Sequence, residues 1–184
     1  LTPQAIRQVG STERHVPGRL PVRYRIGGTG ADGPEERGLA ARCLMGYNAG
    51  PPMLPGGYNN NMQMFQTPDH VVILNEMVHD ARIVSLDGRA HLPDDLGQWM
   101  GSSRGHWDGD TLVVDTTNFT DRIAFQGSGD TLHVVERFTR VDADTILYEF
   151  TLDDPTTYTQ TWGGEVPFRK YDDLLYEYNC HEGN

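Results

Sequence analysis

The apolar and polar positions of the chain change their pattern near residue 60. From there short segments alternate apolar and polar residues and are separated by turn residues, which is typical of antiparallel strands joined by hairpins. The predicted hairpins pair residues 61–66 with 71–76, 103–107 with 111–117, and 132–140 with 145–152, and further strands are predicted at 157–163 and 174–180. The pattern therefore predicts an antiparallel meander of about eight strands.

The stretch from Thr145 to Asp153 shows the alternation most clearly. Ile146, Tyr148, Phe150 and Leu152 occupy one face of this strand, and mostly polar residues occupy the other. Strands of this kind must curl or stack to bury their apolar faces and protect their edges. We expect an all-β fold in which the meander closes into a barrel.

The region before the meander has a different composition. Residues 1–33 are rich in Gly, Pro and Arg without apolar periodicity and are predicted to form an extended arm. Pro34, Glu35 and Glu36 indicate the start of one short helix that ends near Met45. A chain of 184 residues fits one core. We therefore expect an arm at 1–33 and a single β-barrel domain at 34–184.

Polar residues interrupt apolar strand segments in VVILNEMVHDARIV, residues 71–84. This stretch contains Asn75, Glu76, His79, Asp80 and Arg82. An unpaired charge in a core is very costly, so each of these groups needs a partner or a wet cavity. The stretch is therefore the first candidate for a functional site.

Glu136 poses the same question in the strand 132–138, because it shares a face with Leu132, Val134 and Phe138. One interpretation is a structural ion pair in which Arg82 or Arg137 satisfies the carboxylate. The other is a carboxylate that projects into a barrel cavity and orients a ligand. The predicted ligand-binding set, with Trp107 as a flat apolar surface, is Asn75, Glu76, His79, Asp80, Arg82, Trp107 and Glu136.

Two short motifs do not fit their usual structural context. The glycines at 28, 30 and 33 match a dinucleotide fingerprint, but a Pro-rich loop follows where a parallel strand is required. Ser103 lies in a G-x-S-x-G pattern, yet it leads into a hairpin strand rather than a helix. Zinc-binding spacings of Cys and His are missing from the sequence. We expect no organic cofactor and assign no metal site.

Composition excludes some partners. The formal net charge of −11 repels nucleic acids and anionic membranes, and no apolar run is long enough for a membrane helix. Partners are therefore expected to be a small-molecule ligand or further copies of the chain.

Cys43 and Cys180 either form a disulfide that joins the two ends of the main body or remain two buried thiols.

Longer stretches resemble a known family. GHWDGDTLVVDTTNFTDR, NNNMQMFQTPDHVVILNEMVHDARIV, VVERFTRVDADTILYEFTLDDPTTYT and the final YEYNCHEGN are similar to a family of uncharacterised bacterial proteins that are usually exported. The resemblance covers most of residues 34–184 and implies a periplasmic or extracellular location and a Cys43–Cys180 disulfide. Family members extend beyond both ends of this sequence, so we expect a fragment or processed form. The strand pattern is also similar to lipocalin-like barrels.

Three functional hypotheses follow from the sequence. The first is an extracytoplasmic β-barrel domain that binds a small organic molecule in a polar-lined cavity. The second is a hydrolase or lyase that uses carboxylates in that cavity as general acid and base. The third is a structural subunit of a secreted assembly whose N-terminal arm docks on a neighbouring copy.

Overall fold

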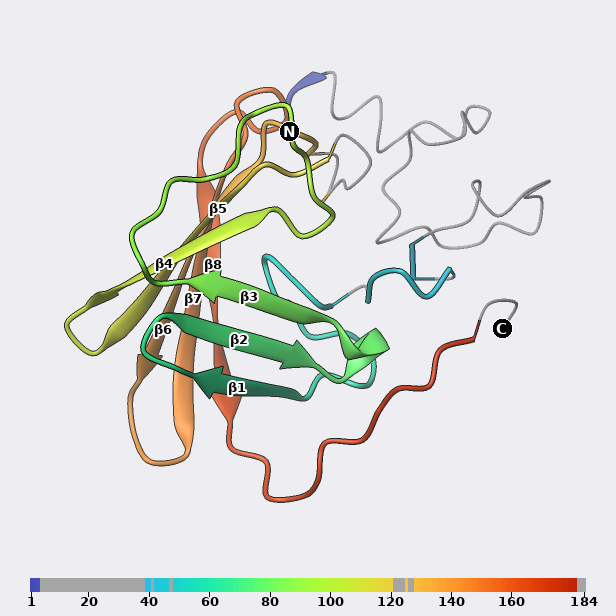
Figure 1. Cartoon of the computed structure of the whole chain (residues 1–184). Helices are drawn as coiled ribbons and strands as arrows, with labels where there is room; N and C mark the ends of the chain where they lie inside the picture. Colours follow the sequence, from blue (N-terminus) through green and yellow to red (C-terminus); the bar gives the residue numbers. More distant parts are fainter. Residues whose placement is uncertain (4–38, 41, 47, 121–124, 126–127, 182–184) are drawn as a thin grey trace.

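The computed structural model describes residues 1–3, 39–40, 42–46, 48–120, 125 and 128–181. Eight strands form one sheet in which the strand order equals the chain order, and the sheet curls into a half-barrel (Figure 1). The strands are β1 (Met62–Gln66), β2 (His70–Asn75), β3 (Ala81–Ser85), β4 (Ser102–Asp108), β5 (Thr111–Thr117), β6 (His133–Arg140), β7 (Thr145–Asp153) and β8 (Trp162–Arg169). A 3-10 turn, η2 (Met77–His79), separates β2 from β3. The predicted all-β class is therefore confirmed.

The sheet is divided between β3 and β4. Every other neighbouring pair is antiparallel with a continuous register, for example β6 with β7 from His133–Asp153 to Arg140–Ile146. In contrast, β3 and β4 are parallel and joined by the single pair Ser85–Arg104. The half-barrel therefore consists of two meanders, β1–β3 and β4–β8, which diverge on one side of that bridge.

The three predicted hairpins are confirmed as β1–β2, β4–β5 and β6–β7. The strand expected at 157–163 begins only at Trp162, because the Asp154 carboxylate accepts the N–H groups of Thr156 and Thr157 and folds this stretch into a turn. The prediction of a strand at 174–180 was wrong. This segment is not paired in the sheet and makes isolated backbone hydrogen bonds such as Tyr178 N–H to the Glu76 carbonyl, at 3.3 Å.

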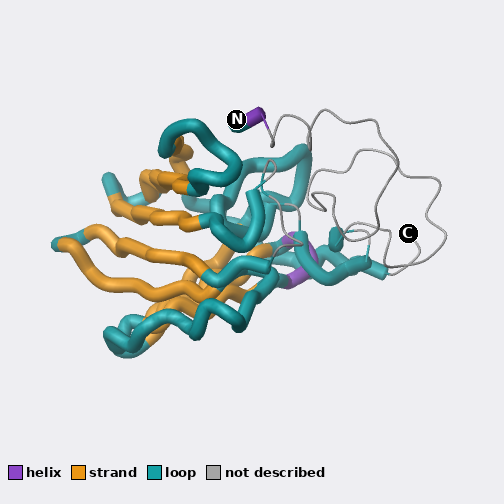
Figure 2. The backbone as a smooth tube through the Cα atoms, turned by 90° about the horizontal axis from the view of Figure 1, so that it is seen from above, coloured by secondary structure: helices purple, strands orange, loops and turns teal. Residues whose placement is uncertain are grey.

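The region before β1 is described only in part. Of the expected helix, residues 34–38 and 41 lie outside the described residues, and the described residues of 39–45 form turns. Most of the expected arm, residues 4–33, also lies outside them. Figure 2 shows the strands gathered on one side of the molecule, with η2 and many of the connecting loops on the other.

The core occupies the inner face of the half-barrel. The predicted alternation in β7 is confirmed, since Tyr148 and Leu152 are fully buried and Phe150 is almost so. The Tyr148 ring stacks on Phe168 of β8 with centroids 5.0 Å apart. Each strand thus contributes alternate side chains to a shared interior, as its two-residue period requires.

A disulfide between Cys43 and Cys180 is present. It connects the segment before β1 with the chain after β8. In Figure 1 the chain after β8 is the red segment that leaves this strand. We call residues 170–181 the C-terminal strap. The strap is also held by an ion pair of Glu177 with His79, at 3.3 Å.

Candidate functional site

An open cleft of about 1030 Å³ lies where β3 and β4 diverge. Its walls are residues 81–83 of β3, residues 102–104 of β4, and the segment that precedes β4, including Leu92 and residues 97–101. We call it the split cleft. It exists because the sheet keeps only one bridge at this point, so the two strand ends separate instead of closing a ladder.

A buried polar network lies beneath this cleft. The Arg82 guanidinium donates two hydrogen bonds to the Glu136 carboxylate, at 2.6 and 3.0 Å. The Tyr148 hydroxyl donates to the same carboxylate at 2.8 Å and accepts the Met53 backbone N–H at 2.9 Å. Arg82 is only 3% exposed, and Glu136 and Tyr148 are fully buried. The structural ion pair expected for Glu136 is therefore present, with Arg82 as its partner.

The electrostatics of this network favour a charged arginine and a neutral tyrosine. Burial would lower the pKa of Arg82, but the Glu136 carboxylate outweighs burial and raises it. Burial raises the pKa of Tyr148 well above its ordinary value, and the negative charge of Glu136 raises it further. The network joins β3 to β6 and β7, so it links the two meanders across the divided sheet.

Two buried donors of the cleft wall remain without a partner. The Nε of Arg82 and the Oγ of Ser102 have no hydrogen-bond partner among the described residues, although Arg82 is 3% and Ser102 is 2% exposed. Both residues line the split cleft. A buried polar group without a partner costs about 1–3 kcal/mol. A molecule in the cleft that brings an acceptor within reach after a small shift of the lining would recover this energy.

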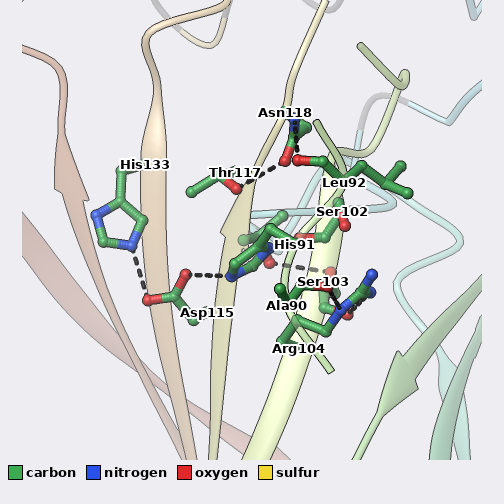
Figure 3. Close-up of polar contacts among 11 residues, drawn as sticks. Ala90, His91, Leu92, Ser102, Ser103, Arg104, Asp115, Thr117, Asn118 and His133 are labelled. Carbon is green, nitrogen blue, oxygen red and sulfur yellow. Dashed lines mark hydrogen bonds and ion pairs between the residues drawn. The ribbon is translucent and has the colours of Figure 1, made fainter. Parts of the chain in front are cut away.

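The segment that precedes β4, which forms one wall of the split cleft, is held in place by the polar contacts that Figure 3 shows. His91 Nδ1 donates to the Ser102 carbonyl at 2.9 Å. The Asp115 carboxylate on β5 lies 3.0 Å from His91 Nε2 and 2.8 Å from Nε2 of His133 on β6. This arrangement holds the segment that precedes β4 against the outer face of β4–β6.

Further hydrogen bonds hold the same segment at its other points. Asn118 Nδ2 donates to the Leu92 carbonyl at 3.2 Å, as Figure 3 shows, and to the Pro93 carbonyl at 3.0 Å. Arg104 Nε donates to the Ala90 carbonyl at 3.0 Å. A wall held at several points keeps its shape before a ligand arrives, which reduces the entropy cost of binding.

Gly101 shapes the floor next to β4. Its φ of +70° favours glycine, and a Cβ there would lie 2.6 Å from the Thr117 carbonyl oxygen. Any larger residue would push residues 101–103 away from β5. The close approach therefore sets the position of Ser102 at the cleft floor.

The surface of the cleft combines apolar walls and an acidic rim. Among the apolar lining residues, Trp99 and Met100 are half-buried and Phe119 is buried. The carboxylates on the lining are Asp80, Asp94, Asp95 and Asp130. Of the two arginines on the lining, Arg82 is neutralised by Glu136, so the four carboxylates outweigh Arg104 and give the cleft a negative potential that disfavours anions.

The structure brings together three of the predicted site residues. Asp80 and Arg82 line the split cleft, and Glu136 lies behind Arg82. Asp80 also accepts the Gly46 N–H, at 2.7 Å. Sequence reasoning missed Trp99 and Ser102, because the segment before β4 has no apolar periodicity and a serine at the start of a strand is common.

The other predicted residues lie elsewhere. Asn75 lines a different cleft, and the Glu76 carboxylate accepts from the backbone N–H and the Nδ2 of Asn61. His79 is at the surface in its ion pair with Glu177. Trp107, 46% exposed, lies near the hairpin turn at the far end of β4. These four side chains do not line the split cleft.

Of the two short motifs, the structure describes only the one at Ser103. Ser103 lies within β4 and its Oγ is 2.9 Å from the Thr116 hydroxyl, so it forms no nucleophile elbow. The glycines at 28, 30 and 33 lie outside the described residues.

Across the described ranges, no group of three His, Cys, Asp or Glu side chains is placed to hold a metal ion. No helix in the same ranges is long and apolar enough to cross a membrane.

Comparisons of the chain with protein-family models, curated proteins and solved structures find no match. The geometry of the clefts and of the buried network is therefore the basis for a functional interpretation.

Proposed function

We propose that this protein is an extracytoplasmic β-barrel domain that binds a small organic molecule in the split cleft. The observation that carries the proposal is the pair of buried donors, Arg82 Nε and Ser102 Oγ, which lack partners among the described residues and belong to residues that line the cleft. Ligand sites are typically concave, with apolar walls and a few polar groups that fix orientation. The split cleft has this composition.

The cleft also indicates the chemistry of its ligand. An acceptor oxygen or nitrogen would meet Arg82 and Ser102, and an apolar body would pack against Trp99 and Met100. The acidic rim favours a neutral or cationic molecule over an anion. The Cys43–Cys180 disulfide supports an oxidising compartment, such as the periplasm or the extracellular space.

The geometry supports binding more strongly than acid and base catalysis. Glu136 is fully buried and accepts three hydrogen bonds, from Arg82 and Tyr148, and Glu76 is engaged by Asn61. Neither carboxylate lines either of the two clefts. The assembly hypothesis depends on the N-terminal arm, most of which lies outside the described residues.

Ser102→Ala tests the proposal because it should weaken ligand binding without a loss of stability. Removing a buried hydroxyl that has no partner should leave stability unchanged or slightly increased. The same change should weaken any cleft ligand about tenfold, because it deletes one donor. A fragment library screened by ligand-observed NMR, followed by calorimetry on the hits, measures affinity, and urea unfolding measures stability.

Trp107→Phe is the matched control, since this residue lies far from the split cleft and should leave affinity unchanged. Ile83→Trp fills the cleft from an exposed position on β3 and should abolish binding. The proposal is refuted if every fragment hit binds the wild type, Ser102→Ala and Ile83→Trp equally well.

A further inference from the structure

A second cleft, of about 750 Å³, lies along the open seam of the half-barrel. The outer strands β1 and β8 do not pair with each other, because the sheet order begins with one and ends with the other. We call this space the seam cleft. It shares no lining residue with the split cleft, so the two can be tested separately.

The walls of the seam cleft are mainly apolar and adaptable. Met62 and Met64 come from β1, Val166 and Phe168 from β8, and Met53 from the loop before β1. Unbranched methionines adjust to irregular shapes and make favourable sulfur contacts with aromatic rings. The walls therefore suit a flat ring system.

One buried polar atom on this lining lacks a partner. The Nδ2 of Asn48 donates to the Asn59 carbonyl at 2.9 Å and to Asn60 Oδ1 at 3.0 Å. Because the Asn59 carbonyl can only accept, these contacts fix which end of the amide is nitrogen. The Oδ1 of Asn48 then has no donor among the described residues, although Asn48 is only 8% exposed. Because Asn48 lines the seam cleft, a small shift of its loop would let this oxygen accept a hydrogen bond from a ligand.

The charges at the cleft mouth do not select an ion. Arg140, Arg169 and Lys170 are interspersed with Asp144 and Asp173 on the lining. Arg140 donates to the carbonyls of residues 142 and 143, so part of its capacity is already used. Mixed signs at the rim and an amide oxygen inside favour a neutral molecule that carries one donor.

The C-terminal strap forms one side of the seam cleft through Tyr171, Leu174 and Leu175. Leu174 is 71% exposed, so the strap presents apolar surface at the cleft that a ligand could cover. The disulfide at Cys180 anchors the far end of this strap. The chain after β8 therefore completes a site that the two strand edges leave open.

From these observations we propose that the seam cleft binds a small neutral aromatic molecule with one hydroxyl group, such as a phenol or naphthol. Its ring packs between the methionines and Phe168, and its hydroxyl donates to Asn48 Oδ1. This site is independent of the one in the split cleft.

The test compares 2-naphthol with 2-methoxynaphthalene, which has the same ring system but no donor. Calorimetry on the oxidised protein should show binding of the naphthol, and the ether should bind at least tenfold more weakly. Val166→Trp, which fills the cleft from a half-buried position on edge strand β8, should abolish binding of 2-naphthol. Ile83→Trp, which fills the split cleft, should leave it unchanged.

Met64→Trp is a second blocking variant from the opposite wall, for use if Val166→Trp does not fold, and thermal unfolding checks both. Equal affinities for naphthol and ether would overturn the role of Asn48. Absence of naphthol binding to the wild type would overturn the site, as would binding lost only in Ile83→Trp. Loss of naphthol binding only in Ile83→Trp would instead place the naphthol in the split cleft. The other outcomes leave the proposal for the split cleft unaffected, because that proposal rests on Ser102 and its own ligands.

Discussion

Replacing Glu136 by glutamine should strongly destabilise the protein without removing any apolar contact. The change removes the negative charge that accepts two hydrogen bonds from Arg82 and places an amide against its guanidinium. Arg82 then stays charged at 3% exposure without its counterion. Breaking a buried ion pair from one side costs about 3–5 kcal/mol.

The loss should be seen directly in urea unfolding followed by tryptophan fluorescence. With a denaturant dependence of about 2 kcal/mol per molar, a cost of about 4 kcal/mol lowers the unfolding midpoint by roughly 2 M. Arg82→Met combined with Glu136→Leu removes both charges, so this double variant should be more stable than Glu136→Gln alone.

Arg137→Gln is the matched control, one residue along the chain. Arg137 pairs with Asp108 at the surface, at 2.8 Å, so its replacement should not move the midpoint measurably. The reasoning is wrong if Glu136→Gln unfolds at the wild-type midpoint, or if the double variant is less stable than the single one.

Three further predictions concern pH and covalent structure. The folded-state pKa of Tyr148 is raised, so its contribution to stability is full below about pH 10 and is lost as the pH rises through the folded-state pKa. In Tyr148→Phe, the melting temperature should therefore fall less steeply at alkaline pH than in the wild type. Burial opposes ionisation of Asp154, but hydrogen bonds from Thr156, Thr157 and Thr131 outweigh burial and lower the pKa of Asp154. The contribution of Asp154 to stability is therefore present above about pH 4 and is lost below it. The difference in melting temperature between the wild type and Asp154→Asn should shrink as the pH falls. The disulfide closes a loop with a sequence separation of 137 residues, so its reduction should lower the free energy of unfolding by about 5 kcal/mol, and an unchanged urea midpoint in reductant would contradict this loop-entropy argument.

The sequence predicted those parts of the fold that depend on local pattern. Alternation located the three hairpins and the inward face of β7, and the position of Glu136 on an apolar face required a partner such as Arg82. These inferences succeed because a two-residue period assigns side chains to faces wherever the strand ends up.

The parts that depend on long-range contacts could not be predicted in this way. Nothing local indicates that β3 and β4 share only one bridge, because the connecting segment is irregular and is positioned by side chains such as His91 and Asn118. The strand expected at 174–180 had the right composition, but this segment pairs with neither open edge of the sheet and is held instead by the Cys180 disulfide and by isolated hydrogen bonds such as Tyr178 N–H to the Glu76 carbonyl. Whether two donors stay unpaired at a cleft floor likewise appears only in three dimensions.

The single bridge between β3 and β4 has a consequence for how the molecule opens. Backbone pairing within each meander is continuous, whereas between the meanders it is reduced to one bridge and the buried Arg82–Glu136 side-chain pair crosses instead, so the sheet has a plane of weakness along Ser85–Arg104. Partial unfolding should therefore release β1–β3 as a unit while β5–β7 stays folded. Amide protons of β2 should exchange with solvent faster than those of β6, although both strands are central to their own meander.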